Sequence, residues 1–410
     1  MSGFTTYLKS IKRSFKLKNF IMYFILAFVI ILFGTLNSVT GLKRSTVTLL
    51  EQMSYSMIMA LSLSLVVGFL GELSLGHAGF MSLGAFLGGY MQTYLYPSLT
   101  AGAPLLSLVL SMLIGGLIAA AFGFVIGLPA LRLKGDYLAI VTLAFGEIVK
   151  VIFTNVKFYA LDGRLLSTTV GVLKTGRYDQ KSLFIIGFIV VLLTMIFIQN
   201  FIKSKHGNAV MAIRDNEIAA RAMGVNVTFY KLLVFVISAF FAGLAGVLYS
   251  NASHNINAAD FDYNYSINFL VMVVLGGMGN LNGSILAAAL ISFLNNKLQT
   301  ILTGDMAGFK NLFYALILIL IVIYNNAPKL RGFRAKYNLR NLFNFVKAKL
   351  TKLFTKKQPV PDPAAEVEYG ADWDKIPTKI EMDALLSTDF TPDNTYVPDK
   401  ADKPKEGGKE

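Results

Sequence analysis

Few side chains of this sequence have the type and setting that chemistry needs, and those few interrupt apolar runs. Glu72, Ser74 and His77 lie in one glycine-rich stretch, and Glu147 lies inside another apolar run. Polar groups in such a setting line a cavity or brace a helix break, and an ionisable one is a functional candidate by default. Each also has a plainer interpretation. Ser74 and His77 would cap the next helix, and Glu147 would pair with Lys150 near the end of its own helix.

Catalysis is not expected from this chain. It contains no Ser–His–Asp or metal-hydrolase pattern and no GxxxxGK[ST] phosphate loop. It has no cysteine, and the three histidines, His77, His206 and His254, are too scattered to suggest a metal cluster. We therefore expect no enzyme activity, no metal site and no cofactor bound by this chain. Any ATP that drives the protein would be hydrolysed by a partner.

The polar groups lie within long apolar runs, which we interpret as membrane spans. Hydrophobic residues make up 54% of the 410 residues, and the mean hydropathy is +0.57. An α-helix needs about 20 apolar residues to cross a bilayer core of about 30 Å. Such runs predict an all-α polytopic membrane protein with about ten transmembrane helices, at residues 20–36, 46–70, 75–96, 105–128, 137–155, 182–200, 229–250, 264–279, 284–302 and 309–325.

The net charge of +14 is explained by basic residues that flank these spans. Ten crossings place residues 1–19, the turn with Arg132 and Lys134, residues 203–228 and the C-terminus on one side. These segments are basic, so the positive-inside rule assigns them to the cytoplasm. Lys43 and Arg44 fall on the other side. The expected location is therefore the plasma membrane, with the transmembrane domain at residues 20–326.

Residues 203–228 are longer and more regular than a turn between two spans requires. Val210, Ile213, Ile218, Ala219 and Met223 are interleaved with charged residues at helical spacing, which predicts a short amphipathic helix over 210–224. Gly224 follows where a helix C-terminal glycine would lie. An amphipathic helix at a membrane surface indicates docking of a soluble partner.

Further glycines mark breaks or close packing. The segment Gly276–Ser284 reads GGMGNLNGS and predicts a second break on the same side as the first. Two broken hydrophobic segments in corresponding halves point to a transporter's central site. Plain helix packing is the preferred interpretation for Gly84/Gly88 and Gly123/Gly127. Asp136, at the start of a predicted span, is interpreted as an N-cap.

The C-terminal region predicts two further segments. Residues 327–357 include apolar residues at spacings of three and four with lysines and arginines between them, which indicates a basic amphipathic helix. It would lie on the anionic inner leaflet or pack on a protein partner. Residues 358–410 are acidic and rich in proline, which predicts a disordered tail.

Four blocks together resemble one known family. They occupy residues 71–85, 135–148, 206–250 and 271–291, and they begin GELSLGHAGF, GDYLAIVTLAFGEI, HGNAVMAIRDNEIAARAMG and VMVVLGGMGNLNG. In this order they resemble the LivM-type permeases of ABC importers for branched-chain amino acids, over roughly residues 50–330. The resemblance implies an ABC importer permease fold.

The resemblance also implies partners and roles. The expected partners are a LivH-like second permease subunit or a second copy, two cytoplasmic ATPases that bind ATP-Mg, an extracytoplasmic binding protein and membrane lipid, with no nucleic acid. The segment Glu217–Ala220, followed by Gly224, would form the coupling helix seated in the ATPase. Coupling residues would be Arg214, Asp215, Glu217, Ala219, Ala220, Met223 and Gly224. The translocation pathway would include Glu72, Ser74, Gly76, His77, Glu147, Gly276, Gly277 and Gly279.

The sequence departs from the family in two places. Asp162–Arg164 replaces a threonine- and glycine-rich pattern in an outer loop, and the chain extends beyond about Lys336. The first departure keeps urea and nucleosides open as alternative cargoes of the same architecture. An ion-coupled secondary transporter is the alternative from another class, with Glu147 as its candidate residue, and a scaffold role of the tail could accompany transport.

Overall fold

The computed structural model describes residues 17–39, 41, 43–95, 102–133, 135–157, 159, 171–174, 183–253, 255–301, 316 and 319. The chain divides into two compact units, Met1–Leu330 and Arg331–Glu410. All described residues belong to the first unit. The predicted amphipathic helix at 327–357, the tail at 358–410 and the Asp162–Arg164 loop lie outside the described residues.

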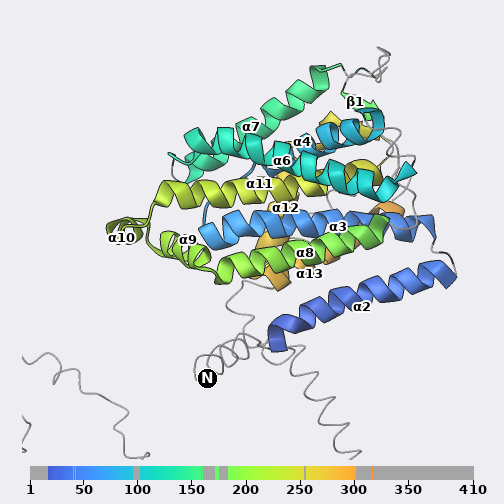
Figure 1. Ribbon diagram of the computed structural model, residues 1–410, viewed down its shortest axis with the longest axis horizontal. Coiled ribbons are helices and arrows are strands. Elements are labelled where there is room, and N and C mark those ends of the chain that lie inside the picture. The colour runs from blue at the N-terminus through green and yellow to red at the C-terminus, as the bar shows by residue number, and fades with distance from the viewer. Residues whose placement is uncertain are drawn as a thin grey trace, which may run out of the picture. The chain divides into compact units, whose positions relative to one another are not determined.

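The first unit is a bundle of apolar helices (Figure 1). Its long elements are α2 (Leu17–Val39), α3 (Arg44–Ser64) with the π-helix η1 (Leu65–Leu70), α4 (His77–Leu83) with the π-helices η2 (Gly84–Gly88) and η3 (Met91–Leu95), α6 (Pro104–Ala130), α7 (Asp136–Asn155), α8 (Leu183–Lys203), α11 (Val227–Ala252), α12 (Tyr263–Gly276) and α13 (Leu281–Ile301).

Five of the described helical segments are long and apolar enough to cross a membrane, by length and composition. They are Arg44–Leu70, Pro104–Ala130, Asp136–Asn155, Leu183–Lys203 and Val227–Ala252, with mean hydropathy between 1.8 and 2.5. Helices also lie at the other predicted spans up to residue 302. A mostly helical, polytopic membrane protein is thus confirmed. The tenth predicted span, 309–325, lies outside the described residues apart from 316 and 319, so the helix number and the side of the termini stay predictions.

The core forms around α11, which packs against α3, α4 and α6. Small residues let these backbones approach closely. A Cβ built on Gly84 would lie 2.6 Å from the Cα of Gly243 on α11, and one built on Gly123 would lie 2.7 Å from the Cβ of Ala239. The predicted packing role of the paired glycines is confirmed.

The expectation of an all-α fold needs one small correction. Strand β1 (Val172–Lys174) pairs antiparallel with β2 (Asn255–Asn257), with Leu173 opposite Ile256. Both of these side chains are fully buried. Two loops at the same end of the bundle thereby satisfy their backbone groups and cover apolar side chains, which the local sequence of neither loop could indicate.

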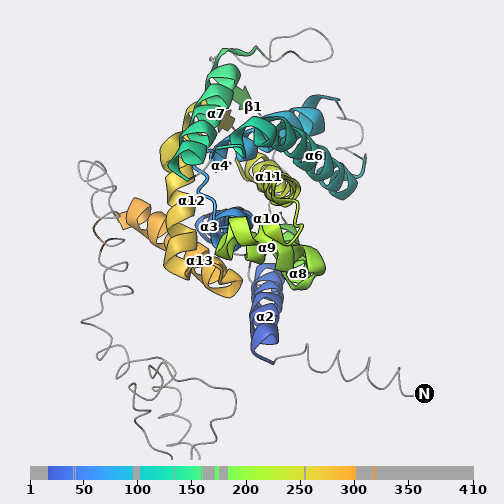
Figure 2. The same ribbon diagram turned by 90° about the vertical axis from the view of Figure 1, so that its left-hand side faces the viewer.

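At the opposite end from β1, two short helices connect α8 to α11 (Figure 1). They are α9 (Lys205–Asp215) and α10 (Glu217–Ala222). Figure 2 looks onto this end, where α9 and α10 lie between α3, α8 and α11.

The prediction of a single helix over 210–224 was wrong. Asn216 has an extended backbone, with φ −158° and ψ 104°, and its Oδ1 accepts a hydrogen bond from the Ala219 N–H at 3.0 Å. Asparagine is a preferred N-cap residue, so it ends α9 and starts α10. The predicted glycine terminus is confirmed. Gly224 has φ +82°, and the N–H of Val225 donates to the carbonyl of Ala220 at 3.1 Å, as in a Schellman motif.

Candidate functional site

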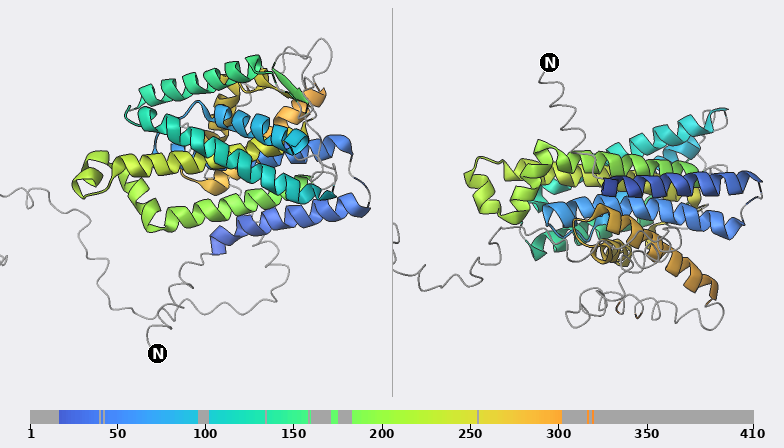
Figure 3. Two further views of the ribbon diagram at one scale, coloured as in Figure 1. Left: turned by 45° about the horizontal axis from the view of Figure 1, so that its top comes forward. Right: turned by 90° about the horizontal axis from the view of Figure 1, so that it is seen from below.

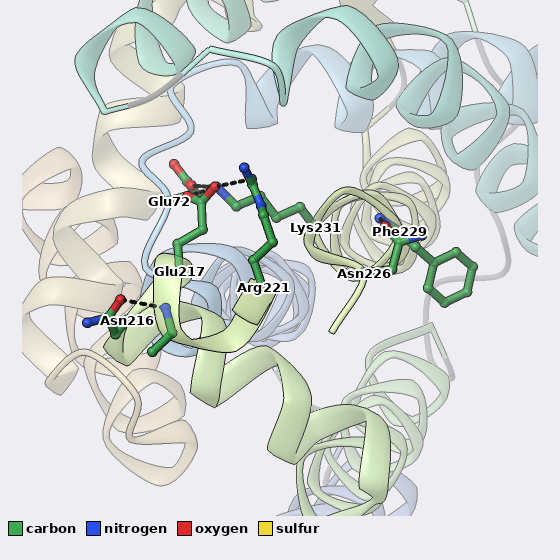
Figure 4. Close-up of polar contacts among 8 residues, drawn as sticks. Glu72, Asn216, Glu217, Arg221, Asn226, Phe229 and Lys231 are labelled. Carbon is green, nitrogen blue, oxygen red and sulfur yellow. Dashed lines mark hydrogen bonds and ion pairs between the residues drawn. The ribbon is translucent and has the colours of Figure 1, made fainter. Parts of the chain in front are cut away.

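Four charged side chains meet where α10 lies against the start of α11 (Figure 4). The Lys231 ammonium donates to Glu72 Oε1 at 2.5 Å and to Glu217 Oε2 at 3.1 Å. Arg221 Nη2 donates to Glu217 Oε1 at 2.8 Å. These four residues form what we call the ion network. It joins three separate segments: the break after η1, helix α10 and helix α11.

The central lysine of the ion network is buried, so its charge must be compensated by nearby carboxylates. The side chain of Lys231 is 4% exposed, so its charge needs both carboxylates nearby to remain stable. The four formal charges sum to zero. Glu217 and Arg221 lie one helical turn apart on α10, which places them on the same face. Glu72 comes from a loop, so its position depends on the break in the chain after Gly71.

Arg214, at the end of α9, connects this helix to both glycine breaks. Its Nη1 donates to the Gly68 carbonyl, on η1, at 3.2 Å. A Cβ built on Gly68 would lie 3.0 Å from the Cα of Gly279, and a Cβ on Gly71 would lie 2.7 Å from Cγ of Arg214. The structure thus brings the two predicted breaks together beside Arg214. Its neighbour Asp215 is exposed and pairs with it at 3.0 Å.

The second break is a tight turn between α12 and α13. Gly277 and Gly279 have φ of +90° and +79°, a region that glycine reaches without strain. Gly276 packs directly on the backbone of Gly283, so neither position has room for a side chain. Helix α12 ends here after 14 residues, about 21 Å, short of a full bilayer crossing.

The first break is braced from outside its own segment. Thr142 Oγ1, on α7, accepts from the Leu75 N–H at 3.0 Å, and Ser266 Oγ, on α12, accepts from the Ala78 N–H at 3.0 Å. Gly76 is the N-cap of α4 and lies against the Thr142 carbonyl, where no side chain would fit. Helix α12 therefore caps the first turn of α4, and α7 holds the chain directly before it.

Ser74 and His77 do not cap α4, which corrects that interpretation. His77 Nε2 lies 2.8 Å from Ser62 Oγ on α3. Ser74 Oγ and His77 Nδ1 are buried without a hydrogen-bond partner among the described residues. Both side chains lie inside the protein rather than on its surface.

Glu147 and Asp136, on α7, lie apart from the ion network. Glu147 forms an ion pair with Lys150, as predicted, and its Oε1 also accepts from the Tyr263 N–H at the start of α12 at 3.0 Å. The prediction that Asp136 is an N-cap was wrong. Gly135, with φ +59°, occupies the N-cap, and Asp136 is the first helical residue, with its charge near the positive end of the helix.

The apolar residues of the predicted helix at 210–224 divide into a buried group and an exposed group. Val210 and Ile213 on α9 are buried, and so is Ala220 on α10. Ile218 and Met223 are 79% and 84% exposed. Ala219 and Gly224 are also exposed. Because the chain turns at Asn216, α10 presents its large apolar side chains outward.

Sequence reasoning missed Lys231. The sequence did indicate that Lys231 is paired, because an unpaired lysine four residues after the start of an apolar helix is energetically costly. Its position was visible in the sequence, but its partners were not. Glu72 lies 159 positions earlier in the chain.

The comparison with known families identifies the family of this chain. The family described as "Branched-chain amino acid transport system / permease component" matches residues 45–324. The chain belongs to this family. It is an integral membrane permease, and the matched range includes the ion network and both glycine breaks.

Individual relatives agree with this assignment. The high-affinity branched-chain amino acid transport system permease protein LivM of Escherichia coli K12 is 32% identical over 256 residues, which are 56% of this chain and 58% of the relative. LivM of Salmonella typhimurium is 35% identical over 206 residues, 43% and 48% of the two chains. The ribose import permease protein RbsC of Haemophilus influenzae is 27% identical over 201 residues, 45% and 61%. The chain spans about half of the length of these relatives. No solved structure matches.

Proposed function

We propose that this permease is the transmembrane subunit of an ATP-driven ABC importer for the branched-chain amino acids leucine, isoleucine and valine. The LivM relatives and the family description support this cargo. The ribose permease relative supports the wider class of solute importers. The observation that carries the ATP-driven mechanism is the ion network, because it links an exposed helix to a break inside the bundle.

The proposed partners are a LivH-like permease or a second copy of this chain, two cytoplasmic ATPases that bind ATP-Mg, and an extracytoplasmic binding protein. The complex would lie in the plasma membrane, with both termini of this chain in the cytoplasm. Helix α10 would dock on the ATPase through Ile218 and Met223. Exposed apolar side chains beside charged ones are typical of a protein interface.

Motion of α10 would reach the bundle by two routes. The first runs from Glu217 through Lys231 to Glu72, and the second runs from Arg214 to the Gly68 carbonyl. Both routes end at the first glycine break. A rigid shift of α9 and α10 would therefore move the loop before α4 and open or close the bundle around it. The chain itself forms and breaks no covalent bond in this cycle.

The coupling residues in this proposal are those of α9, α10 and their termini: Arg214, Asp215, Glu217, Ala219, Ala220, Met223 and Gly224. For the pathway we propose the first break, with Ser74 and His77, and the second break at Gly276–Gly279. The unpartnered Ser74 Oγ and His77 Nδ1 support this assignment, because buried polar atoms without partners are costly unless water or solute meets them.

The experiment is co-purification of the tagged protein in mild detergent, with partners identified by mass spectrometry. We expect an ATPase, a second permease and ATP-dependent leucine uptake after reconstitution with the binding protein. Glu217→Lys should lose the ATPase because it reverses the charge beside Lys231. The matched control is Asp136→Lys, which reverses an exposed carboxylate of α7 on the same predicted side and should retain the ATPase.

Other outcomes separate the alternatives. Binding of urea or a nucleoside, instead of leucine, by the partner binding protein would change the cargo and keep the mechanism. Absence of an ATPase under conditions that hold a known importer together would overturn the ABC proposal. In that case uptake driven by an ion gradient, sensitive to Glu147→Gln, would favour a secondary transporter.

A further inference from the structure

A polar cavity lies between α3, α12 and α13, which pack together on one side of the bundle (Figure 3). Its volume is about 500 Å³. Each helix supplies polar side chains one turn apart, so one polar face of each otherwise apolar helix points into it. The pairs are Gln52 and Ser56 on α3, Asn264 and Asn268 on α12, and Ser292 and Asn295 on α13.

Ser292 gives the strongest sign that the cavity receives a ligand. Its side chain is 1% exposed, and its Oγ has no hydrogen-bond partner among the described residues. In a membrane helix a serine hydroxyl normally bonds to the backbone one turn earlier, as Ser250 does here. A buried hydroxyl left without a partner is energetically costly, and a bound polar group in the cavity would offset this cost.

The charges of the lining residues restrict the chemical class of ligand that the cavity could bind. Among the described lining residues, Asp262 is the only carboxylate, and no lysine, arginine or histidine is present. Asp262 accepts from the Tyr265 N–H and from Asn264 Nδ2, so it is held in place at the start of α12. This end of the cavity therefore favours a cation.

The rest of the lining is apolar or neutral. Phe269, Met272 and Ile291 provide apolar surface, while the carboxamides and hydroxyls provide donors and acceptors without net charge. A ligand that fits this pattern has an ammonium group for Asp262, further polar atoms for the amides, and an apolar side chain. An anion without an ammonium group would find no basic partner in the described lining.

We propose that this cavity is the solute-binding site of the translocation pathway, and that it takes a small zwitterion with an apolar side chain. The inference rests on the proposed function for its cargo, but not for its position. Helix α12 connects the cavity to both glycine breaks. Asp262 is the N-cap of α12, and Ser266 on α12 accepts a hydrogen bond from the Ala78 N–H of α4. Gly276, the last residue of α12, is the first residue of the second glycine break. Movement of the break would thus change the cavity.

The chain has no cysteine, so a single introduced thiol reports on its own surroundings. The test places Ser292→Cys in the assembled transporter, with its ATPases and binding protein, in proteoliposomes. The control is Leu290→Cys, two residues away on the opposite face of α13, where the side chain is 51% exposed on the outside of the chain. Asn268→Cys is the second cavity variant in case Ser292→Cys does not assemble.

The probe is the membrane-impermeant cationic thiosulfonate MTSET. A thiol in contact with water ionises and reacts, whereas each unit by which apolar surroundings raise its pKa slows the reaction about tenfold. We expect Ser292→Cys or Asn268→Cys to react at least about tenfold faster than Leu290→Cys, because a one-unit difference in pKa already has that effect. We also expect modification to stop uptake, and leucine to slow the modification.

The reactivity of the thiols and their protection by leucine distinguish failure of the proposed binding site from failure of the proposed cargo. Equal reactivity of the cavity and control thiols would overturn the cavity as an aqueous pathway, whatever the cargo. Fast modification without protection by leucine, in a transporter that imports leucine, would overturn it as the binding site. If the unmodified protein does not import leucine, the proposed cargo fails, while the difference in reactivity still decides whether the cavity is open to water.

Discussion

Two ion clusters among the described residues of this permease are built differently. Glu147 and Lys150 pair one turn apart on α7, with side chains 30% and 25% exposed. The ion network instead joins Glu72, Lys231 and Glu217 from three separate segments around a lysine that is almost fully buried. A pair within one helix moves with that helix. A network between segments resists their relative motion, so it can transmit displacement.

The two clusters should also differ in how much each contributes to stability and to uptake. An exposed pair contributes about 0–1 kcal/mol, while removing one partner of a buried pair costs about 3–5 kcal/mol because it leaves a charge without compensation. Changes in the ion network should therefore have larger effects than changes in the Glu147–Lys150 pair, both on stability and on ATP-coupled uptake.

The largest effect is expected for Lys231→Met, which removes the cation shared by Glu72 and Glu217 and leaves Glu217 with Arg221 alone. We expect a loss of roughly 3 kcal/mol, the lower end of the range for buried pairs because both carboxylates are partly exposed. The measurement is the unfolding temperature in detergent together with leucine uptake. The double variant with Glu72→Gln should recover part of the stability. Independent, additive effects of the two substitutions would argue against a direct interaction.

Glu72→Gln alone should have an intermediate effect. Lys231 keeps Glu217, and the amide oxygen can still accept a hydrogen bond, so we expect about 1.5 kcal/mol. Because the route from α10 to the break is weakened while the docking face is intact, the ATPase should stay bound but hydrolyse ATP without matching uptake. Uptake per ATP equal to that of the unmodified protein would count heavily against this route.

Gly224→Trp tests the end of α10 without touching the ion network. A Cβ at this position meets no other atom within 4 Å, so the cost is backbone strain at φ +82°, about 1 kcal/mol. The indole would also stand on the docking face beside Met223. We expect insertion to persist and coupling of ATP hydrolysis to uptake to be lost. Gly224→Asn is the control, because asparagine tolerates this conformation. Normal uptake by the tryptophan variant would contradict the assigned role.

The smallest effect is expected for Lys150→Met. The ion pair is partly exposed and local, and Glu147 keeps its hydrogen bond from the Tyr263 N–H, so we expect less than about 1 kcal/mol. Leucine uptake should remain within about twofold of the unmodified protein, since that corresponds to less than 1 kcal/mol. An effect as large as that of Lys231→Met would remove the distinction between the two clusters.

The features that depend on neighbouring residues could be predicted from the sequence. Apolar runs indicated the helices, because about 20 apolar residues are needed to cross a bilayer. Closely spaced glycines indicated both breaks, and Gly224 indicated the end of α10. The Glu147–Lys150 pair followed from a spacing of one turn. Asn216 was readable as an N-cap but was overlooked, and the single predicted helix was therefore wrong.

The contacts between groups that lie far apart in the sequence depend on how the helices pack. Lys231 could have paired with any carboxylate near the membrane surface, and its choice of Glu72 follows from the packing of α11 beside α3 and η1. The capping of α4 by Ser266, in place of Ser74 or His77, and the bond from the Leu75 N–H to Thr142 follow from the packing of three helices. The polar cavity requires three helices to turn their polar faces together. Local periodicity specifies which face of a helix is polar, whereas packing specifies what that face meets.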